Sequence, residues 1–99
     1  MDIKISNNQG KTAVEIAGKI YTLLSDEMKK TFDAQIADGS QVEIDAENLE
    51  YITSAALRVF LALYKRMNAS GGSLTFHKVQ PTVMQVFSLT GFDTFVKFE

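Results

Sequence analysis

Hydrophobic and polar residues alternate over two short stretches near the start of the chain, residues 2–7 and 12–18. A period of two residues is typical of a strand that buries one of its faces. The turn-forming residues 8–10 separate the two stretches, so we predict a β-hairpin. The alternating hydrophobic residues are Ile3, Ile5, Val14 and Ile16.

The hydrophobic period then lengthens to about four residues, which predicts an amphipathic helix. The residues that set this spacing are Leu24, Met28, Phe32 and Ile36. Acidic residues, Asp26 and Glu27, are expected in the first helical turn, where the helix dipole favours negative charge. Gly39 is expected to end the helix in the left-handed conformation.

Alternation returns in residues 41–46 and predicts a third strand. Residues 57–67 then carry a broad hydrophobic stripe, typical of a mostly buried helix that ends at the following glycine pair. Residues 73–79 predict a fourth strand, and Pro81 suits the first turn of a third helix. Residues 95–99 are expected to form a short edge strand or a packed tail.

Strands and helices therefore alternate along the chain, which favours an α/β fold. We predict a small mixed, largely parallel sheet of four to five strands that is covered by amphipathic helices. The length of 99 residues suits one hydrophobic core, so a single domain over residues 1–99 is expected.

Composition and charge narrow the possible functions. The formal charge is −2 and the basic residues are scattered, so neither nucleic acid nor an anionic membrane is an expected partner. The chain has no cysteine, which excludes disulfides and thiolate chemistry and fits the cytosol. The first residues do not resemble a signal peptide, and no apolar run reaches the roughly 20 residues of a membrane span, so we expect a cytoplasmic protein.

Few residues suggest catalysis or metal binding, and we expect no catalytic residue, metal or cofactor. His77 is the single histidine and has no cysteine beside it, so we interpret it as a structural or surface residue. The acidic residues of the third predicted strand are interpreted as a solvated face. Asp45 stands out among them because it lies near the C-terminal end of that strand, where α/β sites gather.

Thr53 and Ser54 precede the second predicted helix and allow three interpretations. A hydroxyl residue at this position is a preferred N-cap, worth about 1 kcal/mol. A nucleophilic serine would need a general base, and the single histidine lies in a different strand. A phosphate would be favoured by the helix N-terminus, yet it would add nearly two negative charges to an apolar docking surface. Such a hydroxyl would act as a reversible switch.

Two longer segments resemble a known family, the STAS domain of bacterial anti-sigma factor antagonists. Residues 45–57, DAENLEYITSAAL, are similar to its pattern D-L-S-G-V-x-F-I-D-S-S-G-L. Residues 83–98, VMQVFSLTGFDTFVKF, resemble its closing helix, its T-G-[LF]-D turn and its phenylalanine-rich tail. Residues 18–20 match its G-E-[LI]-D loop in part, so the resemblance covers essentially the whole chain.

The resemblance implies a STAS-like fold and a regulatory binding protein that is not an enzyme. In this family the unmodified antagonist binds an anti-sigma factor that is also a serine kinase. Phosphorylation abolishes that binding, and a phosphatase restores it. The implied partners are therefore this kinase, which uses the ATP, and a phosphatase. An alternative is a STAS scaffold or sensory module that works in a signalling assembly without phosphorylation.

The chain departs from the family at the implied phosphorylation site. The residue that is usually phosphorylated corresponds to Ala55, and Tyr21 stands where the first loop usually has an aspartate. Either Ser54, the preferred site, or Thr53 accepts the phosphate in a shifted register, or the switch is lost and Ser54 serves as the N-cap. Lys65 is expected to face solvent near the docking surface. The expected docking surface consists of a loop and the helix edge after it, with residues Tyr21, Tyr51, Ile52, Thr53, Ser54, Ala55, Ala56 and Arg58.

Overall fold

The computed structural model describes residues 2–99, which form six strands, three α-helices and one short 3-10 helix. The predicted hairpin, helices and strands are present in the expected order, and the tail forms a short edge strand. In chain order the elements are β1 (Asp2–Asn8), β2 (Lys11–Ile20), α1 (Thr22–Gln35), β3 (Gln41–Asp45), β4 (Leu49–Ile52), α2 (Ser54–Ala69), β5 (Ser73–His77), α3 (Pro81–Leu89), η1 (Phe92–Thr94) and β6 (Lys97–Phe98).

The sheet confirms the predicted mixed, largely parallel arrangement. Its strand order is β1-β2-β3-β5-β6, and β4 pairs with the far end of β2. β1 and β2 are antiparallel, and every other pair is parallel. The sheet has six strands within the described residues, whereas four to five were predicted, because the sequence pattern did not indicate β4. Its buried residues, Leu49 and Ile52, stand at its two ends with two exposed residues between them, so the strand shows no alternation.

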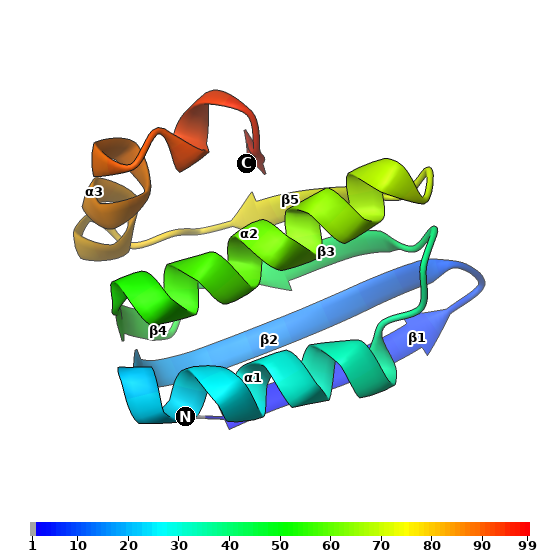
Figure 1. Ribbon diagram of the computed structural model, residues 1–99, viewed down its shortest axis with the longest axis horizontal. Helices are drawn as coiled ribbons and strands as arrows, with labels where there is room; N and C mark the ends of the chain where they lie inside the picture. The colour runs from blue at the N-terminus through cyan, green and yellow to red at the C-terminus, as the bar shows by residue number, and fades with distance from the viewer. Residues whose placement is uncertain (1) are drawn as a thin grey trace.

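Helices α1 and α2 lie side by side across one face of the sheet, while α3 lies beside β4 (Figure 1). We call the opposite side the open face of the sheet, and Glu15 and Glu43 are among its exposed side chains. None of the helices within residues 2–99 has the length and apolar character needed to span a membrane.

The core fills the space between the helices and the sheet, and aromatic rings occupy its centre. The ring centroid of Phe60 in α2 lies 5.3 Å from that of Phe76 in β5 and 6.2 Å from that of Phe87 in α3. All three side chains are fully buried. Aromatic pairs at such separations add to the free energy of burial. This cluster therefore holds α2 and α3 against the sheet and fixes the position of α2 relative to the strands.

The start of α1 differs from the prediction. Tyr21 is the N-cap residue, and the helix begins at Thr22 directly after β2. Asp26 and Glu27 consequently fall beyond the first turn, which contains no acidic residue. The expected acidic first turn was therefore wrong, because the end of β2 determines where the helix begins.

The end of α1 also lies earlier than predicted. The helix ends at Gln35, and Ile36 is already extended because its buried side chain belongs to the core. Gly39 has a φ of +79°, but it lies in the turn that leads to β3 and does not end the helix. Arg66 of α2 provides a hydrogen-bond donor at this helix end, because its Nη2 donates to the carbonyl of Ile36 at 2.8 Å.

The ends of α2 and α3 follow the prediction. Gly71 adopts a φ of +83° after α2, and the amide of Gly72 donates to the carbonyl of Met67 at 2.8 Å. This pattern is the Schellman motif, which satisfies carbonyls at a helix end. Pro81 is the first residue of α3, and Gly91 follows that helix with a φ of +78°.

Candidate functional site

Helices α1 and α2 begin at the same edge of the sheet. β2 and β4 run parallel, with Ile20 opposite Ile52, and the Thr53 amide donates to the Ile20 carbonyl at 3.1 Å. Tyr21 follows β2 and Thr53 follows β4, so the N-terminal ends of both helices come together. The carboxyl ends of parallel strands are where α/β proteins commonly place functional side chains.

An exposed pair of aromatic side chains marks this edge. Tyr21 is 50% exposed and Tyr51 is 44% exposed, and their ring centroids are 5.7 Å apart. Leu23, in the first turn of α1, is 92% exposed. Large apolar side chains that are exposed together are typical of protein-binding surfaces, and tyrosine is enriched among the residues that dominate binding.

Thr53 and Ser54 have different structural roles. Thr53 is the N-cap of α2, and its Oγ1 accepts a hydrogen bond from the Ala56 amide at 3.4 Å. Ser54 is the first helical residue, its side chain is exposed, and its hydroxyl forms no hydrogen bond within residues 2–99. The interpretation of Ser54 as the N-cap is therefore wrong, because the chain turns into the helix one residue earlier.

The predicted docking loop is not a loop. Tyr51 and Ile52 belong to β4, and Ser54 begins α2. The side chains of Ile52 and Ala56 are buried, at 2% and 0% exposure, because they face the core. They are therefore unavailable as contacts, and the docking surface must be corrected. The remaining predicted residues on this surface, all exposed or half-buried, are Tyr21, Tyr51, Thr53, Ser54, Ala55 and Arg58.

A shallow groove runs between α1 and α2 next to Ser54, and the sequence did not reveal it. Its volume is about 280 Å³ near Ala55 and Arg58, and a second hollow of about 220 Å³ follows along the same two helices. Both hollows include Lys29, Val59 and Ala62. The only sequence signal was the small size of Ala55 and Ala62, which keeps the groove open.

An ion pair lies on the α1 side of this groove. Lys29 Nζ is 2.7 Å from Asp33 Oδ2, and both side chains are about half exposed, at 56% and 53%. The hydrogen bond from Lys29 lowers the pKa of Asp33, and the positive charges of Lys29 and Arg66 act in the same direction. The groove therefore presents fixed charges of both signs at neutral pH.

The single histidine, His77, is not placed to act as a general base for Ser54. Both ring nitrogens of His77 lie near carboxylates instead, with Nε2 2.9 Å from Glu43 Oε1 and Nδ1 3.7 Å from Glu99 Oε2. The charged residue on the helix face one turn after Ser54 is Arg58. This surface is thus suited to docking and to holding a negative group.

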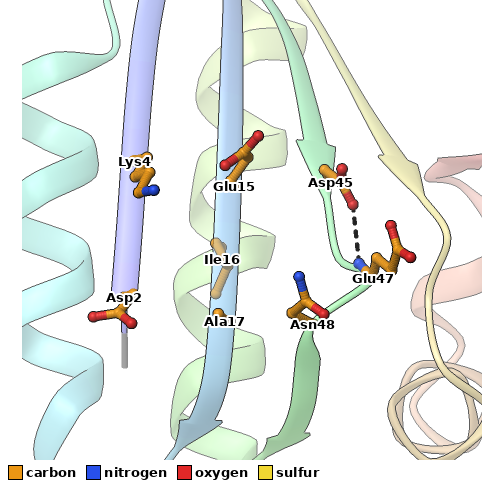
Figure 2. Close-up of a pocket in the computed structure, with 8 residues that line it drawn as sticks. All are labelled: Asp2, Lys4, Glu15, Ile16, Ala17, Asp45, Glu47 and Asn48. Atoms are coloured by element: carbon orange, nitrogen blue, oxygen red, sulfur yellow. Dashed lines mark hydrogen bonds between the residues drawn. The ribbon is translucent and has the colours of Figure 1, made fainter.

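A larger pocket lies elsewhere, on the open face of the sheet (Figure 2). Its volume is about 320 Å³, and it is lined by residues of β1, β2, the end of β3 and the turn between β3 and β4. Asp45 lies at the predicted strand end, but its Oδ1 accepts a hydrogen bond from the Glu47 amide at 3.0 Å. Asp45 therefore stabilises the turn into β4, and the pocket combines four carboxylates with the single ammonium group of Lys4.

Comparison with known proteins supports the resemblance seen in the sequence. Residues 3–97 match the family model described as "Mlab, STAS domain". BtrV of Bordetella bronchiseptica, named as a proposed anti-sigma factor antagonist, is 28% identical over 93 residues, which cover 93% of this chain and 80% of BtrV. The anti-sigma-B factor antagonist of Bacillus subtilis is 23% identical over 91 residues, covering 92% of this chain and 84% of that protein.

Among solved structures, the anti-sigma factor antagonist SpoIIAA in its unphosphorylated form has the same fold. It matches with a TM-score of 0.83 at 15% sequence identity. The match covers 99% of this chain and 88% of the SpoIIAA chain.

Proposed function

The chain belongs to the STAS domain family, and on this premise we propose that it is a cytoplasmic regulatory module that acts as an anti-sigma factor antagonist. The observation that carries the proposal is the exposed Tyr21–Tyr51 pair beside the N-terminus of α2, where the groove between α1 and α2 begins. The names of the relatives, BtrV and the Bacillus subtilis protein, support the same role. The function proposed is binding, without catalysis.

The partner we propose is an anti-sigma factor with serine kinase activity. Apolar contacts would come from the two tyrosines and from Leu23, whose side chains are already exposed. Arg58 and Lys65 are exposed on α2, so they would favour a partner with acidic groups opposite them. Binding of this partner would release the sigma factor that it holds.

Ser54 is the proposed phosphorylation site, in preference to Thr53. Its hydroxyl is exposed and without a hydrogen bond within the described chain, whereas the Thr53 hydroxyl is half-buried and caps α2. A phosphate on Ser54 would be stabilised by the N-terminus of α2. It would also add nearly two negative charges beside Tyr51 and Ala55, which opposes apolar docking. A phosphatase would reverse the change.

A second candidate function is a STAS scaffold or sensory module that binds its partner constitutively. Ala55, which corresponds to the residue usually phosphorylated in the family, favours it, because a methyl side chain cannot accept phosphate. The same docking surface would then be permanently available. The two candidates differ in one measurable respect, which is the response of binding to negative charge at residue 54.

The test combines phosphate mapping with binding. The purified protein is incubated with an anti-sigma factor kinase from the same organism and with ATP, and the phosphorylated residue is located by mass spectrometry. The proposal expects phosphate on Ser54 and none on the Ser54→Ala variant. Ser54→Asp should weaken binding of the same kinase at least about tenfold, which corresponds to 1.4 kcal/mol.

The matched control is Ser6→Asp, which adds the same charge at an exposed serine of β1. This variant should bind the kinase like the wild type. If the kinase binds but phosphorylates neither Ser54 nor Thr53, and Ser54→Asp binds normally, the phosphorylation switch is rejected and the constitutive scaffold is supported. Failure of the kinase to bind the wild type would reject the antagonist role itself.

A further inference from the structure

Three polar side chains from three neighbouring strands meet on the open face of the sheet. Glu43 lies in β3, His77 ends β5, and Glu99 directly follows β6. β5 lies between β3 and β6 and is parallel to both. His77 lies opposite Asp45 and Glu43 lies opposite Thr75, so Glu43 and His77 are diagonal neighbours on the same face of the sheet.

Backbone hydrogen bonds hold two of these residues in place. The His77 carbonyl accepts from the Ala46 amide at 2.9 Å. The Glu99 amide donates to the Phe76 carbonyl at 2.8 Å, and the Glu99 carbonyl accepts from the Lys78 amide at 3.2 Å. The backbone of these two residues is therefore fixed, and their side-chain torsions remain free to adjust to a ligand.

The potential ligand atoms are close together. His77 Nε2 is 2.9 Å from Glu43 Oε1, and His77 Nδ1 is 3.7 Å from Glu99 Oε2. One ligand atom from each residue can be chosen so that all three lie within 4.8 Å of one another. Ligand atoms of a tetrahedral zinc site with bonds of about 2.1 Å are roughly 3.4 Å apart. Because Glu43 and Glu99 approach different ring nitrogens of His77, one of these two exposed glutamate side chains would have to rotate toward the other nitrogen to share an ion.

We propose that Glu43, His77 and Glu99 form a binding site for a divalent transition-metal cation, with Zn²⁺ as the best match. One imidazole nitrogen and two carboxylate oxygens are a ligand set that suits zinc, whereas Mg²⁺ and Ca²⁺ prefer oxygen ligands alone. Two carboxylates also neutralise the charge of one divalent cation. Water would complete the coordination, since the cluster lies at the surface.

The neighbouring lysine is compatible with this site. Lys97 Nζ lies 3.0 Å from Glu99 Oε1, and the other oxygen, Oε2, is the one directed at His77. Glu99 therefore has an oxygen for each positive partner. A metal ion would link β3 and β5 to the chain after β6, which is an edge strand of only two residues. Its expected structural effect is to hold this short edge strand on the sheet.

Titration calorimetry with ZnCl₂ tests the site directly on the whole chain. We expect saturable binding of one Zn²⁺ per chain and no comparable binding of Mg²⁺. His77→Ala, Glu43→Gln and Glu99→Gln should each weaken the binding at least about tenfold, as is common for residues that support metal sites. The control variant is Glu15→Gln, which removes an exposed carboxylate of the same sheet face and should leave binding unchanged.

A second measurement does not depend on calorimetry. Zn²⁺ should raise the melting temperature of the wild type, because a ligand that binds only the folded state stabilises it. The rise should be absent in Glu43→Gln, whose exposed position makes loss of folding unexpected. A dissociation constant for Zn²⁺ above about 1 mM, which corresponds to a binding free energy weaker than about 4 kcal/mol, would reject the site. Binding that persists unchanged in His77→Ala would reject it equally.

Discussion

The rings of Tyr21 and Tyr51 pack against each other at the edge of the sheet in a tilted arrangement, with centroids 5.7 Å apart, although one residue is the N-cap of α1 and the other belongs to β4. The parallel pairing of β2 with β4 brings them together, since Lys19 lies opposite Tyr51. The surface proposed for docking therefore depends on a strand, β4, that is only four residues long.

The contact between these two rings should be measurable in the free protein. We expect Tyr21→Ala and Tyr51→Ala to show a coupling free energy of about 0.5 kcal/mol, the lower end for aromatic pairs because both rings are partly solvated. A double-mutant cycle from urea unfolding measures it. Leu23→Ala paired with Tyr51→Ala serves as the control and should be additive. Additivity of the two tyrosine variants would contradict the contact.

Removal of the helix cap should affect stability but not the start of the helix. Thr53→Ala is expected to lower the free energy of unfolding by about 0.5–1 kcal/mol, because the Ala56 amide loses its acceptor. Thr53→Ser retains the hydroxyl and should lower the free energy of unfolding by less. Ser54→Ala, which removes a hydroxyl that forms no hydrogen bond within residues 2–99, is the comparison, and its free energy of unfolding should lie within about 0.5 kcal/mol of the wild type. Equal losses in Thr53→Ala and Ser54→Ala would show that Thr53 is not the cap.

A negative charge at residue 54 should stabilise the fold even though we propose that it weakens docking. Ser54→Asp places a carboxylate in the first turn of α2, where the helix dipole contributes about 0.3–1 kcal/mol at low ionic strength. Thermal unfolding at low and high salt measures the effect, which should diminish as salt is added. Destabilisation at low salt would indicate that the helix end does not accept an anion.

Arg66 should be important for stability because it joins the two helices. Its guanidinium donates to the carbonyls of Ile36 and Phe32, at 2.8 Å and 3.4 Å, where α1 ends. Arg66→Ala is expected to lower the free energy of unfolding by about 1.5–3 kcal/mol, the range for hydrogen bonds to charged groups. Arg58→Ala removes an exposed arginine of the same helix and should change stability by less than about 0.5 kcal/mol. Similar losses in the two variants would contradict the capping role.

Gly72 is required for steric reasons. A Cβ atom at this position would lie 2.2 Å from the Ser40 carbonyl oxygen, which is backbone and cannot rotate away. A Cβ atom at Gly71 would meet open space. Gly71→Ala should therefore lower the free energy of unfolding by about 1–2 kcal/mol, and only because of the positive φ at this residue. Urea unfolding should show that Gly72→Ala is the more damaging of the two substitutions. The opposite order would mean that the turn after α2 packs differently against β3.

Much of the fold was predictable because it rests on local periodicity. The hairpin, the three helices and the parallel sheet were anticipated, since side chains of β2 and β3 alternate between buried and exposed positions and those of α2 repeat with the helical period. β4 was missed because its burial follows from pairing with β2, not from an alternation of its own. The end of α1 was misjudged for a similar reason, as a residue of α2 caps it.

The sequence by itself determined which residues bury apolar surface, where turns occur and which family the chain resembles, because these depend on residue type and short spacing. Only the tertiary structure decided that Thr53 is the cap and Ser54 the free hydroxyl, and that Ile52 and Ala56 face the core. Only the tertiary structure places Tyr21 against Tyr51 and His77 beside Glu43 and Glu99. Strand pairing sets these contacts between distant segments, and no local pattern encodes which strands become neighbours.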